Sequence, residues 1–106
     1  MAREKFQTLT EQMFYILLCL QQECCGVDVM DRVARMTEGR VAIGPGTLYS
    51  LLESFQSEGF IQETRVEGRK RSYQITVKGR LRLEEEVVRL RRQTEDYLKY
   101  GKGALA

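Results

Sequence analysis

One change of pattern in the middle of the chain limits the folds open to it. Residues 8–59 carry apolar side chains at helical spacing, interrupted by glycines. Residues 60–75 instead form two short β-prone segments on either side of Glu67-Gly68, and helical spacing then returns from residue 77 to about residue 99. Two such segments around a glycine-containing turn are typical of a hairpin. The order predicts a mainly α-helical fold with one small β-hairpin before the last helix.

The first helical segment is apolar on all sides. Thr8-Leu9-Thr10-Glu11 fits a capping box, so we expect a helix that starts at Thr8 or Thr10 and continues to about Gln22. Met13–Leu20 is an uninterrupted apolar run of eight residues, whereas a membrane span needs about 20, so we expect no membrane partner. A surface helix needs only one apolar stripe. The second apolar face predicts a partner beyond the domain's own core.

Two more helices follow, separated by glycines. Helical spacing predicts one over residues 27–37 and another over residues 45–57. Gly44-Pro45-Gly46 lies at the start of the latter, where proline is tolerated because its missing N–H would be unpaired there anyway. One face of this third helix is leucine and phenylalanine, and the other is small, polar and nearly free of charge.

The last helix carries a heptad seam. Thr76 is its expected cap, and a helix over residues 77–99 would be about 33 Å long at 1.5 Å per residue, which outreaches so small a domain. We interpret Glu84-Glu85-Glu86 as a solvated face of this helix. Spacings of four and three residues predict pairing with a second copy of the chain, and they involve Leu83, Val87, Leu90, Thr94 and Tyr97.

Composition excludes several classes of protein. The chain has no histidine, no nucleophile motif and no C-x-x-C, so we expect no enzyme, no metal site and no cofactor. Its three cysteines are an odd number, which suits free thiols in the cytoplasm, and no export leader is apparent. The adjacent Cys24 and Cys25 are either small semi-buried residues or a redox-sensing pair.

Positive charge is concentrated in one region. The net charge is only +2, but residues 65–92 hold ten basic and four acidic side chains, whereas residues 1–64 hold five basic and nine acidic ones. A local basic patch is a candidate footprint for a polyanion. The cations of the hairpin, three of which are consecutive, lie around its turn. Arg69 and Arg71 would share one face of a strand.

The order of three helices, a basic hairpin and a long helix is that of a winged helix-turn-helix. In such motifs the second helix of the pair enters the major groove of DNA, and cationic side chains hold phosphates. We therefore expect residues 1–76 to form a winged helix-turn-helix DNA-binding domain and residues 77–106 to form a dimerisation helix with a short tail. The DNA-binding candidates are Gly46, Thr47, Tyr49, Ser50 and Ser54 on the third helix, with Arg65, Arg69, Lys70 and Arg71 on the hairpin.

The chain also resembles a known family. Gly44-Pro45-Gly46-Thr47-Leu48-Tyr49 and Glu58-Gly59-Phe60-Ile61 look like the recognition-helix signature of PadR-type transcriptional regulators, and Gly68-Arg69-Lys70-Arg71-Ser72-Tyr73 resembles their wing. The single C-terminal helix resembles the short subfamily. That resemblance implies a cytoplasmic homodimeric repressor that binds an inverted-repeat operator in double-stranded DNA. The alternative is a winged-helix module that binds protein instead of DNA.

The apolar faces of the first and last helices supply the remaining candidates. For the dimer interface these are Phe14, Leu18, Leu83, Val87, Leu90, Thr94, Tyr97 and Leu98. A small-molecule effector bound between these helices would alter the separation of the third helices, which is an allosteric coupling. Its candidate contacts are Phe14, Tyr15, Leu18, Val87 and Tyr97. The same five residues are equally consistent with dimer core.

Overall fold

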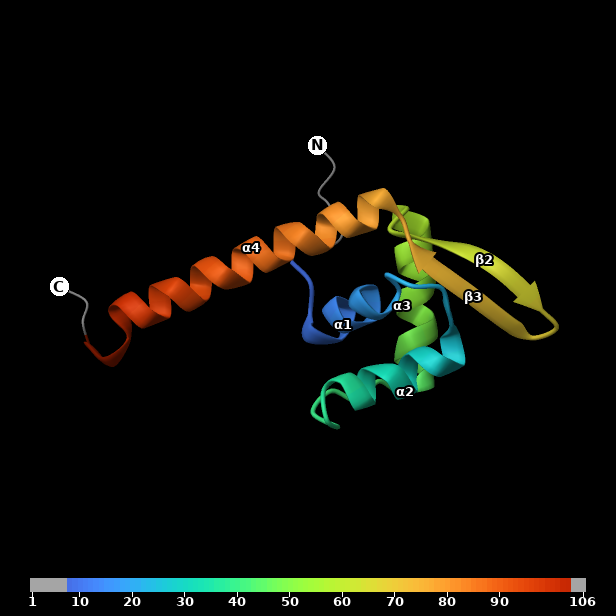
Figure 1. Ribbon diagram of the computed structural model, residues 1–106, viewed down its shortest axis with the longest axis horizontal. Coiled ribbons are helices and arrows are strands. Elements are labelled where there is room, and N and C mark those ends of the chain that lie inside the picture. Colours follow the sequence, from blue (N-terminus) through green and yellow to red (C-terminus); the bar gives the residue numbers. More distant parts are fainter. Residues whose placement is uncertain (1–7, 104–106) are drawn as a thin grey trace.

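The computed structural model describes residues 8–103, apart from the side chain of Lys102. Figure 1 shows the shorter helices with a β-hairpin on one side and a long helix that extends away on the other. This confirms the mainly helical winged-helix fold. The elements are α1 (Glu11–Cys19), β1 (Cys24–Cys25), α2 (Gly26–Met36), α3 (Pro45–Glu58), β2 (Ile61–Glu67), β3 (Lys70–Ile75), α4 (Val77–Tyr100) and a final 3₁₀ turn (Gly101–Gly103).

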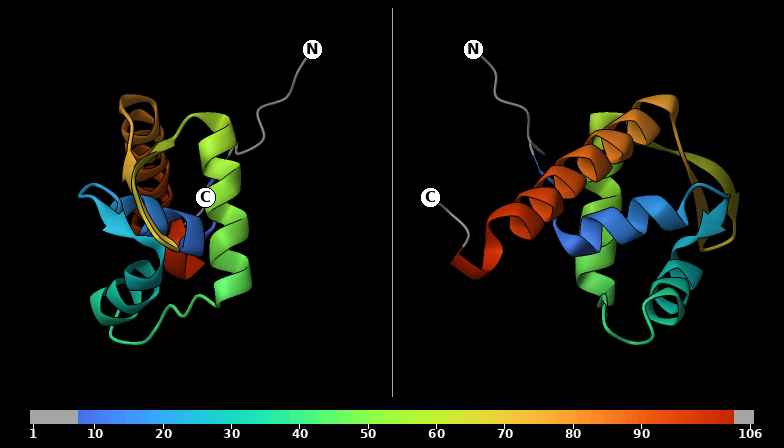
Figure 2. Two further views of the ribbon diagram at one scale, coloured as in Figure 1. Left: turned by 90° about the vertical axis from the view of Figure 1, so that its right-hand side faces the viewer. Right: turned by 60° about the vertical axis from the view of Figure 1, so that its left-hand side comes forward.

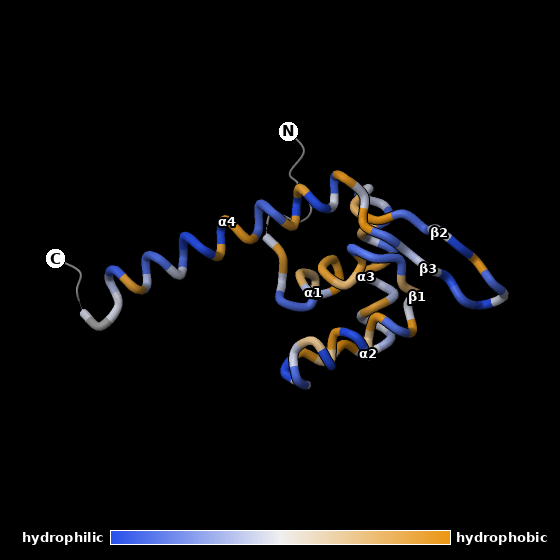
Figure 3. The backbone as a smooth tube through the Cα atoms, viewed as in Figure 1, coloured by the Kyte–Doolittle hydropathy of each residue, from blue (hydrophilic) through white to orange (hydrophobic). Residues whose placement is uncertain are grey.

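The core lies where α1, α2 and α3 meet the sheet. Figure 3 shows hydrophobic segments in all three helices, while the hairpin is mostly hydrophilic toward its turn. The largest fully buried apolar side chains come from all three helices and are Phe55, Ile16, Leu17, Leu20, Leu48, Leu52, Val29 and Val33. Burial of this set is the main favourable contribution to folding. It also fixes the orientation of α3.

The sheet has one strand that the sequence pattern did not indicate. The strand order is β1-β3-β2, and all neighbours are antiparallel. Strand β1 pairs Cys24 with Tyr73, and Thr64 is the extra residue of a bulge in β2. Two residues are too few to show the alternation of apolar and polar side chains that indicates a strand. This strand is therefore recognised only by its pairing with β3. The sheet ties the start of α2 to the hairpin.

Helix α1 starts at the second of its two expected positions, but its capping partner and its end differ from the expected ones. The capping residue is Thr10 and not Thr8: the hydroxyl of Thr10 accepts a hydrogen bond from the Met13 N–H at 3.2 Å, and the Met13 sulfur accepts one from the Thr10 N–H at 3.4 Å. The helix also ends at Cys19, before Gln22. Its end comes early because the Leu20 carbonyl accepts a hydrogen bond from the Ile75 N–H at 2.8 Å, which draws the chain toward β3.

Helix α4 starts on the domain and leaves it. The Thr76 hydroxyl caps the first turn by accepting from the Gly79 N–H at 3.1 Å, and a Cβ at Gly79 would lie 2.1 Å from the Phe60 carbonyl oxygen. Glycine is therefore required for the helix to begin this close to the domain. Every residue from 91 to 100 is exposed, and Figures 1 and 2 show this half of α4 extending beyond the other helices.

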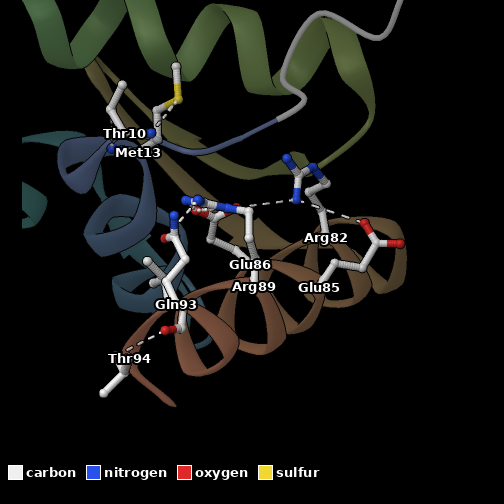
Figure 4. A network of polar contacts seen from close by, with 9 residues as sticks. Thr10, Met13, Arg82, Glu85, Glu86, Arg89, Gln93 and Thr94 are labelled. Atoms are coloured by element: carbon white, nitrogen blue, oxygen red, sulfur yellow. Dashed lines mark hydrogen bonds and ion pairs between the residues drawn. The ribbon is translucent and has the colours of Figure 1, made fainter. Parts of the chain in front are cut away.

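The expectation that Glu84-Glu85-Glu86 is a solvated face is wrong for Glu86. Its side chain is 1% exposed, and Figure 4 shows it among cationic side chains of α4. Arg89 donates to Glu86 Oε2 through Nε, at 3.1 Å, and through Nη2, while Arg82 Nη1 lies 3.8 Å from Glu86 Oε1. Burial favours a raised pKa for Glu86, but the hydrogen bonds from Arg89 and the Leu9 N–H, with the charges of Arg89 and Arg82, outweigh it and lower the pKa.

Candidate nucleic-acid interface

Helix α3 presents a polar face to solvent. Its inward residues Leu48, Leu52 and Phe55 are buried, so the rotation of the helix about its axis is fixed. The five residues of α3 predicted to contact DNA are all at least partly accessible to solvent. Gly46, Thr47, Tyr49 and Ser50 are exposed, and Ser54 is half-buried.

The first turn of α3 is open at its end. Gly44 is the N-cap residue, Pro45 has no N–H to satisfy, and no side chain caps the helix. The N–H groups of Gly46 and Thr47 therefore lack helical partners and point along the axis toward solvent. A helix start with free N–H groups and the positive end of the dipole favours a phosphate.

The hairpin β2–β3 is the wing of the fold, and its turn consists of Gly68 and Arg69. Gly68 adopts φ 61°, a left-handed value that glycine takes without steric cost. Because Arg69 lies in the turn and strand β3 begins at Lys70, Arg69 and Arg71 do not share a strand face as expected.

Two of the four wing cations are already paired. Arg71 Nη1 lies 2.9 Å from Glu63 Oε2, and Arg65 lies 3.9 Å from both Glu23 and Glu67. Arg69 and Lys70 make no ion pair with any residue between 8 and 103. The strongest uncompensated positive charge of the wing is therefore at its turn.

A cleft of 340 Å³ joins the wing to the helix-turn-helix. Tyr49 of α3 lies on one side, and the start of α2 closes the end. A Cβ at Gly26 would lie 3.0 Å from the Tyr49 ring, so glycine allows this ring to lie over the first turn of α2. The lining combines aromatic, thiol and cationic groups: Cys25, Gly26, Val27, Tyr49, Arg69, Lys70, Arg71 and Tyr73.

Chemically, this cleft suits an anion better than a catalytic reaction. It brings together two unpaired cations, a phenol hydroxyl and the N-terminus of α2, which no side chain caps. These groups bind phosphate oxygens by charge and hydrogen bonds. The sequence analysis did not include Gly26 and Val27 among the site residues, although both line this cleft. The feature that could have indicated them is the glycine directly after the adjacent cysteines.

The two adjacent cysteines differ in burial. Cys19 and Cys24 are buried and Cys25 is half-exposed, with all three thiols free. Burial, followed by the nearby Cys19 thiol, raises the pKa of Cys24 to about 12, which keeps it protonated and unreactive at neutral pH. Within residues 8–103 no group of three or more His, Cys, Asp or Glu side chains could hold a metal ion.

Four of the five residues predicted to bind an effector line three different hollows among the described residues. Phe14 and Tyr15 face Leu90 across a groove of 340 Å³ between α1 and α4. Phe14 also borders a groove of 370 Å³ with Val87. Leu18 lines a separate hollow beside α2, and Tyr97 borders neither of the α1–α4 grooves.

The predicted dimer residues divide according to their position along α4. Leu83 is buried by its own subunit, whereas Leu90, Tyr97 and Leu98 are exposed, to 40%, 64% and 75%. The Thr94 hydroxyl donates to the Leu90 carbonyl at 3.0 Å and is therefore satisfied within the helix. Of the predicted dimer residues on α4, those beyond Leu83 thus all have exposed surface. None of the described helices is long and apolar enough to cross a membrane.

The sequence of the chain matches the model of a known protein family. The model described as "Transcriptional regulator PadR-like family" matches residues 16–85, which run from α1 through the wing into α4. No curated protein sequence matches the chain.

Solved structures with the same fold include regulators from three bacteria. A transcriptional regulator from Clostridium thermocellum, Cth-833, has a TM-score of 0.74 at 19% identity, over 90% of this chain and 100% of that one. Bacillus subtilis PadR in complex with operator DNA has a TM-score of 0.65 at 22% identity, over 74% and 47%. The PcaV regulator from Streptomyces coelicolor, with its natural ligand, has a TM-score of 0.69 at 18% identity, over 87% and 62%.

Proposed function

Because this chain belongs to the PadR-like family of transcriptional regulators, we propose that it is a repressor that binds an inverted-repeat operator as a homodimer. Family membership makes it a DNA-binding regulator and not an enzyme. The observation that carries the finer proposal is the cleft shared by α3, the start of α2 and the two unpaired cations of the wing. Repression itself is inferred from the resemblance to the short subfamily.

In this proposal α3 is the recognition helix. The major groove admits an α-helix, and base edges are read by polar side chains on its outer face. Thr47 and Ser50 are exposed on that face, and Ser54 is half-buried beside them. A protein-interaction module would need an apolar or acidic surface here, so this face supports DNA.

The wing and the two helix starts hold phosphates. Arg69 and Lys70 supply charge, Tyr49 supplies a hydroxyl, and the start of α2 supplies N–H groups on the same cleft. Arg65 and Arg71 would have to leave their carboxylate partners to add to this contact. We therefore assign them a smaller share of the affinity than Arg69 and Lys70.

The outer half of α4 pairs with a second copy of the chain. Exposed apolar side chains at heptad spacing are costly in a monomer and are covered by a partner helix in a coiled coil. Two copies would then place their recognition helices in successive major grooves on one side of the duplex, which requires an inverted repeat.

An effector binds the groove between α1 and α4 in this proposal. Phe14 and Tyr15 supply its aromatic wall, and Leu90 lies opposite them. A ligand there alters the separation of α1 and α4, and through it the spacing of the two recognition helices.

The test is operator binding by a variant with a charged recognition face. A duplex selected by the wild-type protein from a random library serves as specific DNA. We expect Ser50→Glu to abolish binding, because it places a carboxylate against phosphates and base acceptors, while circular dichroism stays unchanged. Gln22→Glu makes the same charge change at an exposed position after α1 and should bind normally. Unchanged affinity for Ser50→Glu would remove this face from the interface.

A further inference from the structure

The segment that leads into the recognition helix is fastened to α1 by side chains. Arg40 Nη1 donates to Glu11 Oε2 at 2.7 Å, and Arg40 Nη2 donates to the Tyr15 hydroxyl at 3.2 Å. The guanidinium carbon also lies 5.8 Å from the centre of the Tyr15 ring. Two residues further on, the Ala42 carbonyl accepts from Gln12 Nε2 at 3.1 Å.

This segment determines where α3 begins. Glu38 and Gly39 turn the chain after α2 with positive φ values of 53° and 79°, and α3 starts at Pro45. Val41 and Ile43 are buried anchors between these points. The hydrogen bonds of Arg40 and Ala42 attach the solvent-exposed side of the same short segment to α1.

Helix α1 stands between this segment and α4. Glu11 and Tyr15, which hold Arg40, also line the groove of 340 Å³ against Glu86 and Leu90. One end of α1 therefore contacts both the helix proposed to dimerise and the chain that leads into the recognition helix.

We propose that Arg40 is a positioning residue: its contacts with Glu11 and Tyr15 fix the start of the recognition helix against α1. The inference rests on the proposed role of α3 in reading DNA. A displacement of α1 relative to α4 then moves residues 40–42 and, with them, the N-terminal end of α3. This gives the dimer a direct mechanical link from α4 to the DNA-reading face.

A competing assignment for Arg40 is direct contact with a phosphate, since the side chain is exposed. The two assignments predict opposite effects of removing Glu11. If Arg40 bound phosphate, Glu11→Gln would release the guanidinium and strengthen binding to all DNA. If Arg40 positions α3, Glu11→Gln loosens the segment and weakens binding to selected DNA only.

The experiment compares Glu11→Gln, Arg40→Gln and the double variant in the full-length protein. Selected and random duplexes are titrated at several salt concentrations. Glu84→Gln removes the same charge from an exposed position of α4 and is the matched control. We expect each single variant to lose about threefold to tenfold in affinity for the selected duplex, since exposed pairs are individually weak and a dimer has two. The double variant should lose no more than Arg40→Gln alone.

The salt dependence separates positioning from phosphate contact. Binding to random DNA and the slope of log affinity against log salt should match those of Glu84→Gln in all three variants. A gain in affinity for Glu11→Gln, or a shallower slope for Arg40→Gln, would overturn the inference. So would variants that bind the selected duplex like the control. If the wild-type protein selects no duplex at all, the proposed function fails first, and the inference with it.

Discussion

At the scale of single residues, three adjacent glutamates of α4 have different environments. Glu84 and Glu85 are exposed, whereas Glu86 is buried. The spacing in the sequence indicates this burial, because Glu86 follows Leu83 by three residues and precedes Leu90 by four. All three therefore lie on one helical face. A glutamate is almost never buried without partners. Those partners are Arg89, Arg82 and the backbone of Leu9, and only the fold brings Leu9 to the site.

The buried carboxylate makes stability depend on pH. Because the pKa of Glu86 is lowered in the folded state, its stabilising contribution is present above the ordinary value of about 4.3 and is lost as pH falls through the folded pKa. We expect Glu86→Gln to lower the free energy of unfolding by about 1 to 3 kcal/mol at pH 7, since Arg89 loses its hydrogen-bonded counter-ion and Arg82 loses one of two nearby carboxylates.

Urea denaturation from pH 7 to pH 3 measures this effect. The difference between wild type and Glu86→Gln should shrink below about pH 4, and Glu84→Gln should show no comparable difference at any pH. A difference of constant size across the range would mean that the carboxylate contributes by packing and not by charge.

At the scale of elements, the sequence pattern predicted those helix ends that are determined by residues within one turn of them. Helices α2, α3 and α4 begin and end within a residue of their expected positions, because glycines, Pro45 and the Thr76 cap act within one turn. Strand β1 and the early end of α1 were missed, because both depend on pairing with β3, more than 45 residues away. For the candidate site, the sequence pattern indicated residues of α3 and the wing but not the start of α2. It also could not show which cations are paired, because the ion pairs of Arg65 and Arg71 with carboxylates depend on the sheet register.

That pairing leads to a prediction for the wing. Arg69→Ala with Lys70→Ala removes the two unpaired cations, up to about four phosphate contacts in a dimer. At about 0.9 per contact, the slope of log affinity against log salt should become shallower by about 3 to 4 units, with similar losses on selected and random DNA. Arg92→Ala with Lys99→Ala removes equal charge from α4 and should change the slope little. A collapse of operator preference with an unchanged slope would show that the wing reads bases.

At the scale of the whole molecule, α4 has more apolar surface than one subunit covers. Leu90 is 40% exposed and faces the same side as the buried Leu83, while Val88 is 49% exposed on the opposite side of the helix. The two residues are similar in exposure and differ in direction, so they test which face of α4 meets a second copy. The heptad spacing places Leu90 on the seam and Val88 off it, and the structure adds that both side chains are exposed.

We expect Leu90→Lys to convert the dimer to a monomer and Val88→Lys to leave it a dimer. In the first variant two ammonium groups enter an apolar interface, which costs several kcal/mol, or about a thousandfold or more in the dimer dissociation constant. In the second, both charges stay in water.

Sedimentation at micromolar concentration distinguishes these results. A gel shift on a single half-site should still detect the Leu90→Lys monomer, since the recognition helix and wing are untouched. Dissociation of Val88→Lys alone would place the interface on the opposite face of α4, and a monomeric wild type would remove the paired-helix geometry and with it the reason for an inverted repeat.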